Sequence, residues 1–319
     1  MDIVTVQSGG DVSKDEILIC VKGAKPFKVL NQEGALLAAA ERLPRPCVIH
    51  MERSGGHERL AARVLGASGI QVRLHNPLKA RRLAQAVGRR AKTDAVDATA
   101  LAETGELLPN FPPKSEERQA LTDLCRAIET IKQTATQYKK RLGSPELDEA
   151  AKNAYRRVIK SLSSELQNLE KEFVKAVKAS SLAEDYRLAI SVPDVGPATA
   201  RNCVCELPEN VMQATTPQIC SYAGLAPIDD SSGKHTGPSR NGRGNLRLKA
   251  AMYMSATAAL SHQQWAKDLY ARLRAKGRTH QQAIVAVMRR QLVRVATVIK
   301  RRTPWEKQPP GTEINAGEP

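Results

Sequence analysis

Aromatic residues are scarce in this sequence of 319 residues. Phe, Trp and Tyr together make up 3% of it, so its hydrophobic cores must consist mainly of Leu, Ile, Val and Ala. The scarcity argues against a surface that binds nucleic acid chiefly by stacking bases on aromatic rings. Hydrophobic residues still reach 41%, which is enough for two compact units and a connector in a chain of this length.

Zinc-binding cysteine pairs and long apolar runs are also missing. The six cysteines include no CxxC pair, and the spacing of Cys203 and Cys205 suits zinc poorly. Most cysteines lie in apolar runs, which is typical of buried thiols in a reducing compartment. No run approaches 18 apolar residues and the first residues do not resemble a signal peptide, so we expect a cytoplasmic protein with no membrane span.

Acidic residues are outnumbered by basic ones. The chain has 33 Asp and Glu against 49 Lys and Arg, which gives a formal net charge of +16. A protein this basic usually binds a polyanion, and nucleic acid is the commonest one. The alternative is that the charge only keeps the protein soluble.

The hydrophobic pattern divides the chain into three parts. Up to residue 110, strand-like and helix-like segments alternate, starting with a strand over 2–7 and a turn over 8–15, which predicts a mixed sheet flanked by helices. Over 115–180, two apolar runs at heptad spacing are joined by a Gly-Ser-Pro turn, which predicts an antiparallel helical hairpin serving as a spacer or in oligomerisation. Three more helices are expected, around 245–261, 263–276 and 279–302.

Four acidic residues of the first part are candidates for a metal site. Asp94 and Asp97 lie three apart in RRAKTDAVDATALAE, which should be helical, so they share one helix face. Asp11 lies in the predicted turn after the first strand, and Glu52 ends the buried strand CVIHME. Four carboxylates could hold two Mg²⁺ or Mn²⁺ ions that clamp the attacking and leaving oxygens of a phosphodiester. Each acid alone can equally be a turn residue or a helix cap.

A segment rich in Gly, Ser and basic residues over 229–245 is the second candidate site. Ser231 and Ser232 precede Gly233, and the basic residues that follow without an acid among them are Lys234, Arg240, Arg243, Arg247 and Lys249. No GxSxG elbow surrounds the serines, which argues against an α/β-hydrolase. Neighbouring arginines suit a serine that attacks a phosphodiester. The alternative is a phosphate-binding loop whose serines take no part in chemistry.

Two further segments point to nucleic acid. VPDVGPATA is similar to a helix-hairpin-helix turn, which offers backbone N–H groups to a phosphate, although Asp194 replaces the usual glycine and a plain packing turn is the alternative. From Lys267 to Arg302 the chain has eleven basic residues and one acid. Arg289 and Arg290 are predicted to face nucleic acid, with a merely solvated helix face as the alternative.

Six motifs, in order, resemble the DEDD transposases of the insertion sequence 110 family. They are GGDVSKD, MERSGG, AKTDAVDATALAE, VPDVGPATA, YAGLAP with SSGK, and LRLKAAMYMSA, and the resemblance covers about residues 1 to 302. That family is related to the Piv DNA invertase and includes bridge-RNA-guided recombinases. This sequence departs from the family pattern at Gly10, where an aliphatic residue is usual, and at Asp194.

The resemblance implies an α/β RuvC-like, RNase H-type N-terminal domain. An antiparallel coiled-coil arm and an all-α transposase domain with a helix-hairpin-helix-like element would follow. The expected domains are residues 1–110, 111–182 and 183–305, with a disordered tail over 306–319.

The resemblance also implies an activity and its partners. Asp11, Glu52, Asp94 and Asp97 would bind Mg²⁺, and Ser232, rather than Ser231, would attack DNA and form a covalent phosphoserine link. Composite active sites would form in a dimer or tetramer, with a structured guide RNA, near the nucleoid of a prokaryotic cell. The rival functions are a RuvC-like nuclease or junction resolvase that activates water, and a non-catalytic DNA-bridging protein.

Overall fold

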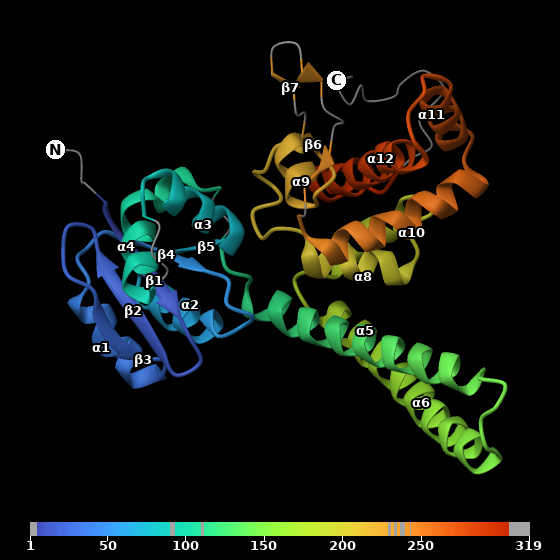
Figure 1. The fold of residues 1–319 in the computed structure, drawn as a ribbon, viewed down its shortest axis with the longest axis horizontal. Coiled ribbons are helices and arrows are strands. Elements are labelled where there is room, and N and C mark those ends of the chain that lie inside the picture. The colour runs from blue at the N-terminus through green and yellow to red at the C-terminus, as the bar shows by residue number, and fades with distance from the viewer. Residues whose placement is uncertain are drawn as a thin grey trace. The chain divides into compact units, whose positions relative to one another are not determined.

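The computed structural model describes residues 5–89, 93–109, 112–228, 231–232, 235–236, 240–242 and 244–305. They belong to two compact units, Met1–Lys114 and Ser115–Pro319 (Figure 1). In these ranges no helix combines the length and the apolar character needed to cross a membrane. The tail predicted to be disordered, 306–319, lies outside the described residues.

A five-stranded mixed sheet forms the centre of the first unit, as predicted. Its strand order is β3-β2-β1-β4-β5, in which β1 pairs antiparallel with β2 but parallel with β4. The remaining neighbours pair antiparallel for β2 with β3 and parallel for β4 with β5. The strands are β1 (Val6–Val12), β2 (Glu16–Val21), β3 (Phe27–Leu30), β4 (Cys47–Glu52) and β5 (Gln71–His75).

Helices cover both faces of this sheet (Figure 1). On one face, Ile17, Ile49 and Met51 form a core with Leu36 of α1 and Leu65 of α2. On the other face, α4 packs against β1 and β2. The helices are α1 (Glu33–Arg42), α2 (Glu58–Ala67), α3 (Pro77–Ala86), α4 (Asp94–Thr104) and the short 3₁₀ helix η1 (Gly105–Leu107).

The first strand is longer than its sequence indicated. The turn predicted over 8–15 was wrong for residues 8–12, because β1 continues through both glycines to Val12, and Asp11 lies within the strand. Gly9 faces α4, where a Cβ atom would lie 2.0 Å from the carbonyl oxygen of Ala98 and 2.6 Å from the amide nitrogen of Ala102. The glycine therefore permits close packing of helix on strand rather than a turn.

A long helical hairpin opens the second unit. The two predicted helices are confirmed as α5 (Glu116–Leu142) and α6 (Glu149–Ala179), which pack along each other; their supercoiling stays a prediction. At the base, the buried Arg118 donates to the carbonyl oxygen of Val204 at 2.6 Å and pairs with Glu209 at 2.7 Å. Arg118 therefore ties the hairpin firmly to the helical domain that follows.

The rest of the second unit is a helical domain built around α12. The three C-terminal helices predicted from the sequence are confirmed, whereas the helix α7 was not predicted. Val287, Leu292 and Val295 of α12 are fully buried in the core. The helices are α7 (Ala183–Ser191), α8 (Pro197–Glu206), α9 (Thr216–Tyr222), α10 (Leu246–His262), α11 (Gln264–Ala275) and α12 (His280–Arg301).

Candidate functional site

Asp11 and Glu52 lie on adjacent parallel strands and point to the same face of the sheet. The register pairs Gly10 of β1 with Met51 of β4, so Asp11 and Glu52 occupy the next position on each strand. Gly10 faces the core that contains Met51, and side chains alternate along a strand, so both acids project toward the opposite face. That face is the one covered by α4, and both carboxylates are half-buried there.

Asp94 and Asp97 occupy the first turn of α4. The Thr93 hydroxyl caps this helix by accepting from the amide of Val96 at 3.3 Å. Asp97 is half-buried and pairs with Arg81 of α3, with 3.3 Å between the guanidinium and the carboxylate oxygen. Asp94 is exposed. The structure thus places the two strand acids and the helix that carries the other two acids on one face of the sheet.

The four acids are of a chemical type that can bind a divalent metal ion. Carboxylate oxygens are the ligands that Mg²⁺ and Mn²⁺ prefer. Among the described residues, however, no three Asp, Glu, His or Cys side chains gather closely enough to hold an ion. In the structure, the positive charge next to the Asp97 carboxylate is the guanidinium of Arg81. The metal set predicted from the sequence stays a prediction.

A buried histidine pair, missed in the sequence, lies on the same face. His50 donates from Nε2 to the Gln7 side-chain oxygen at 2.8 Å, which leaves its Nδ1 to accept from Nε2 of His75 at 2.8 Å. His75 is the register partner of Glu52. Burial lowers the pKa of His50 to about 3 and that of His75 to about 4, helped in both cases by the charge of Arg73. The signal available in the sequence was a histidine inside each of two buried strands.

We expect this pair to make the first unit less stable in acid. Both histidines are neutral in the folded state, whereas in the unfolded chain they gain a proton below the ordinary pKa of 6.5. Stability is therefore lost as the pH falls from about 6.5 toward 4, by on the order of 1–2 kcal/mol per histidine at pH 5. Urea unfolding at pH 7.5 and 5.0 measures it. His75→Gln should weaken the pH dependence and His57→Gln, at an exposed position, should not; equal behaviour would contradict the assignment.

The segment with the candidate nucleophile contains two short antiparallel pairs of strands. β7 (Ser231–Ser232) pairs with β8 (His235–Thr236), and β6 (Pro227–Ile228) pairs with β9 (Arg240–Asn241). The segment expected as a loop is thus partly paired backbone, with Ser232 opposite His235. Gly233, Lys234 and Arg243 lie outside the described residues.

The downstream end of this segment is anchored to the helical core. The backbone amide of Asn245 donates to the carbonyl oxygen of Tyr222 at 2.8 Å, and its side-chain oxygen caps α10. The side-chain amide of Asn245 donates at 2.8 Å to Glu206, a buried carboxylate at the end of α8. Gly244, with φ 50°, passes so close to Gly224 that a Cβ atom would lie 2.1 Å from its nitrogen. These contacts fix the point at which the segment returns to the core.

Several predicted phosphate ligands already contact the protein itself. Arg247 pairs with Glu129 of α5 at 3.2 Å, and Arg290 stacks on Trp265 with 5.0 Å between the guanidinium carbon and the ring centroid. Arg289 is half-buried beside Cys220. Burial raises the pKa of the Cys220 thiol, and the positive charge of Arg289 offsets part of that rise. Lys249 is also half-buried. Binding of nucleic acid by these residues and by Arg240 stays a prediction.

Asp194 adopts the left-handed conformation that the turn before α8 requires. Its φ of 64° is one that glycine favours, which explains why a glycine is usual at this position. The buried carboxylate accepts from Nδ1 of His262 at 2.8 Å. The phosphate-binding role of this turn stays a prediction, and the buried negative charge opposes it.

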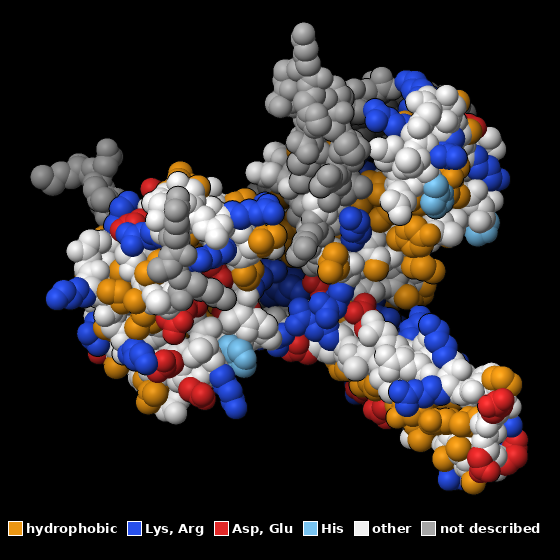
Figure 2. All heavy atoms as spheres, in the orientation of Figure 1, with side chains coloured by type: hydrophobic (Ala, Val, Ile, Leu, Met, Phe, Trp, Pro, Cys, Tyr) orange, Lys and Arg blue, Asp and Glu red, His pale blue; other side chains and the backbone are white. Residues whose placement is uncertain are grey.

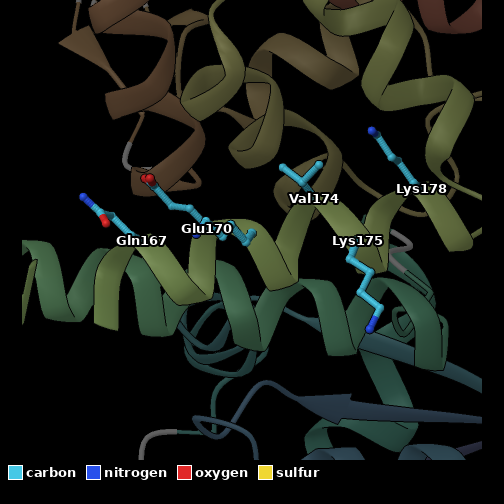
Figure 3. Close-up of a pocket in the computed structure, with 6 residues that line it drawn as sticks. Gln167, Glu170, Val174, Lys175 and Lys178 are labelled. Carbon is cyan, nitrogen blue, oxygen red and sulfur yellow. The ribbon is translucent and has the colours of Figure 1, made fainter. Parts of the chain in front are cut away.

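An open hollow of about 630 Å³ runs along α6 (Figure 3). Its lining consists of Gln167, Glu170, Lys171, Val174, Lys175 and Lys178. None of the candidate catalytic side chains lines it, so it does not belong to the candidate catalytic site.

Two family models match the chain, in order. A model for DEDD transposases of the IS110 type, described as "Transposase", matches residues 9–149. A second, described as "Transposase IS116/IS110/IS902 family", matches residues 186–271. The chain belongs to the IS110 family of transposases. The first match contains all four candidate carboxylates of this transposase, and the second contains Ser232.

Named relatives agree with this assignment. The transposase is 28% identical over 244 residues to the pilin gene-inverting protein of Moraxella bovis, covering 75% of each chain. It is 32% identical over 165 residues to an uncharacterized 43.6 kDa protein of insertion element IS110 from Streptomyces coelicolor, covering 50% of this chain and 41% of that protein. A third relative, a 44.8 kDa protein of insertion element IS116 from Streptomyces clavuligerus, is 27% identical over 154 residues, covering 48% of this chain and 38% of that protein. The transposase is therefore an enzyme of DNA recombination that cleaves DNA.

Proposed function

We propose that this transposase exchanges DNA strands with Ser232 as its nucleophile and with divalent cations held by Asp11, Glu52, Asp94 and Asp97. The observation that carries the proposal is the shared face of the sheet. Asp11 and Glu52 project from adjacent parallel strands toward the side covered by the helix that begins with Asp94. Neighbouring strand ends are where α/β folds gather functional groups.

In the proposed reaction, the Ser232 hydroxyl oxygen attacks a DNA phosphorus atom. A serine–phosphate ester forms, the bond between the phosphorus and the leaving DNA oxygen breaks, and the proton of the serine ends on that oxygen. A hydroxyl of another strand then attacks the ester and releases the serine, so strands are exchanged without net hydrolysis. Bound Mg²⁺ or Mn²⁺ would supply Lewis-acid stabilisation of the charge on the transferring phosphoryl group.

In the proposed reaction, residues of the first unit would bind the cations and residues of the second unit would contact the phosphate. The four carboxylates would hold the cations, and Asp97 must first give up its pairing with Arg81. Cationic groups of the serine segment, Arg240 and Arg247 among them, would stabilise negative charge on the phosphate. The hydrogen bond between Asn245 and Glu206 fixes the point at which that segment returns to the helical core.

We also propose that active sites are composite, with the acidic face of one copy serving the serine of another in a dimer or tetramer. The division of the carboxylates and the serine between separate compact units supports this arrangement. A relative named for inverting a pilin gene makes DNA inversion one outcome of such exchange. A structured guide RNA is part of the proposal on the family resemblance alone.

Covalent trapping tests the nucleophile directly. The protein is incubated with Mg²⁺ and nicked DNA that loses a short fragment after cleavage, and the products are run on a denaturing gel. We expect a protein band shifted by DNA and restored by nuclease. Free nicked DNA with no shifted band would instead support the RuvC-like nuclease that activates water.

Replacing Asp97 by Asn should lower DNA cleavage by about a hundredfold or more and leave DNA affinity within about twofold. The change removes a charge needed to hold a cation while keeping the shape of the side chain. Single-turnover cleavage and fluorescence anisotropy measure the two quantities. Glu103→Gln on the same helix, which removes an ion pair with Arg89 instead, is the matched control. A non-catalytic bridging protein would show no cleavage to lose.

A further inference from the structure

We infer that the exposed cations of α11 and of the turn after it bind the phosphate backbone of double-stranded DNA. This surface, the α11 basic surface, consists of Lys267, Arg272, Arg274, Lys276 and Arg278, and all five side chains are exposed. Figure 2 shows Lys and Arg side chains gathered over α11. The inference goes beyond the proposed function because it needs neither the serine nor a metal site.

Three of the five cations of this surface have no acidic partner among the described residues. Between residues 267 and 278 the sequence has five basic residues and one acid, Asp268, which accepts from the side-chain amide of Gln264 at 2.8 Å. Within the described ranges, Lys267, Lys276 and Arg278 make no ion pair with an acidic side chain. Clustered cations that lack internal partners are the ones able to exchange small counterions for phosphates.

The helix that carries the surface is rigidly held from behind. Ala266 is fully buried, and Trp265 is covered by the guanidinium of Arg294, 3.8 Å from the ring centroid. The turn is fixed as well, because Gly277 adopts φ 78° and the Thr279 hydroxyl starts α12 with a capping box. A ligand therefore meets side chains on a preformed support, which lowers the entropy cost of binding.

The arrangement suits duplex DNA rather than a compact anion. Lys267 and Arg274 lie seven residues apart, two turns along one face of a helix about 18 Å long. Duplex DNA presents a negative charge about every 1.7 Å of its axis. Cations spread over the α11 basic surface can therefore contact several phosphates at once. Phosphate contacts of this kind position a protein on DNA without reading its sequence.

The arginines that the sequence predicted to contact nucleic acid lie on a different helix, α12. Arg289 and Arg290 were expected to face nucleic acid, but both are half-buried and Arg290 stacks on Trp265. In the same region, the five cations of α11 and its turn are exposed, as are Arg301 and Arg302 at the end of α12. Periodicity could not separate the two helices because both combine an apolar face with basic residues.

The salt dependence of DNA binding tests the surface. We compare the full chain with a triple variant, Lys267→Gln, Lys276→Gln and Arg278→Gln, using a fluorescent 30-base-pair duplex in 50–200 mM KCl. Loss of three phosphate contacts should make the negative slope of log K against log salt less steep by about 2.7. The matched control, Lys139→Gln, Lys140→Gln and Arg141→Gln, removes three charges from the end of α5. It should change the slope by less than about 0.9, the value of one contact.

Several outcomes would show that the α11 basic surface does not bind duplex DNA. Equal slope changes in the two variants, or no change in either, would overturn it. So would a change seen only with single-stranded RNA of the same length, which would assign the surface to RNA. A third variant, Lys267→Arg, Lys276→Arg and Arg278→Lys, keeps the charges and should restore the slope, which separates binding from misfolding. At saturating DNA the Gln variant should still form the covalent Ser232 adduct if that proposal holds, so the two can fail independently.

Discussion

Replacing Ser232 by Ala should abolish the covalent protein–DNA adduct and slow strand cleavage by at least about 10³-fold. Without the serine hydroxyl no covalent ester can form, however well the remaining groups position the DNA. Removal of a nucleophile therefore lowers the reaction rate more than most other substitutions in an enzyme. Quantitative denaturing gels measure adduct formation against time. DNA affinity should stay within about twofold, because the alanine removes only a hydroxyl group.

The neighbouring serine provides the matched control. Ser231 lies in the same two-residue strand, β7, so Ser231→Ala makes the same chemical change one position away. Only one of the two hydroxyls is proposed to serve as the nucleophile, so the two variants should differ in adduct formation. Retained adduct in Ser232→Ala with loss in Ser231→Ala would transfer the role to Ser231. Retained cleavage in both variants would end the serine hypothesis.

Replacing Gly9 by Ala should destabilise the first unit by about 3 kcal/mol or more and remove cleavage with it. The added methyl carbon would lie 2.0 Å from a backbone oxygen of α4 and 2.8 Å from the Cβ atom of Leu101, so the helix must move. Overpacking against backbone is costly because no side-chain rotation relieves it. Moving α4 also displaces Asp94 and Asp97 from their face of the sheet. Urea unfolding and single-turnover cleavage measure the two effects.

Other glycines of the same unit separate this clash from a general effect of substitution. At Gly34 in α1 an added Cβ meets no atom within 4 Å, so Gly34→Ala should leave stability unchanged or slightly higher. At Gly10 the nearest atom is the flexible Met51 side chain at 3.0 Å, so Gly10→Ala should have an intermediate effect. Equal stability of Gly9→Ala and Gly34→Ala would show that α4 does not lie as closely on β1 as the structure has it.

Much of the fold was readable from local patterns. The apolar alternation of EILICV and the apolar run CVIHME predicted β2 and β4, and the heptad spacing from Leu121 to Phe173 predicted the helical hairpin. These features depend on neighbours along the chain, which a single sequence displays directly. The resemblance of six ordered motifs to a known family then pointed to a transposase.

The remaining features depend on contacts between distant segments. Gly9 looks like a turn residue until α4, about 90 positions later, is placed against it. His50 and His75 form a pair only because β4 and β5 are neighbours in the sheet. In the same way, nothing in the sequence near Asn245 indicates that Glu206 holds it. The spacing of hydrophobic residues along the chain does not indicate such contacts between distant segments.

The ion pair between Asp97 and Arg81 has a consequence for how the protein responds to metal. The Arg81 guanidinium offsets the negative charge of Asp97, so we expect this unit to stay folded in cation-free buffer. At the proposed metal site, Mg²⁺ would then have to displace this guanidinium from Asp97 as well as lose part of its own water shell. Measured affinity would accordingly understate the strength of the carboxylate ligands, and Arg81→Gln would tighten Mg²⁺ binding while making the metal-free protein less stable. At the proposed metal site, the arginine would thus raise the cation concentration that the transposase needs for activity.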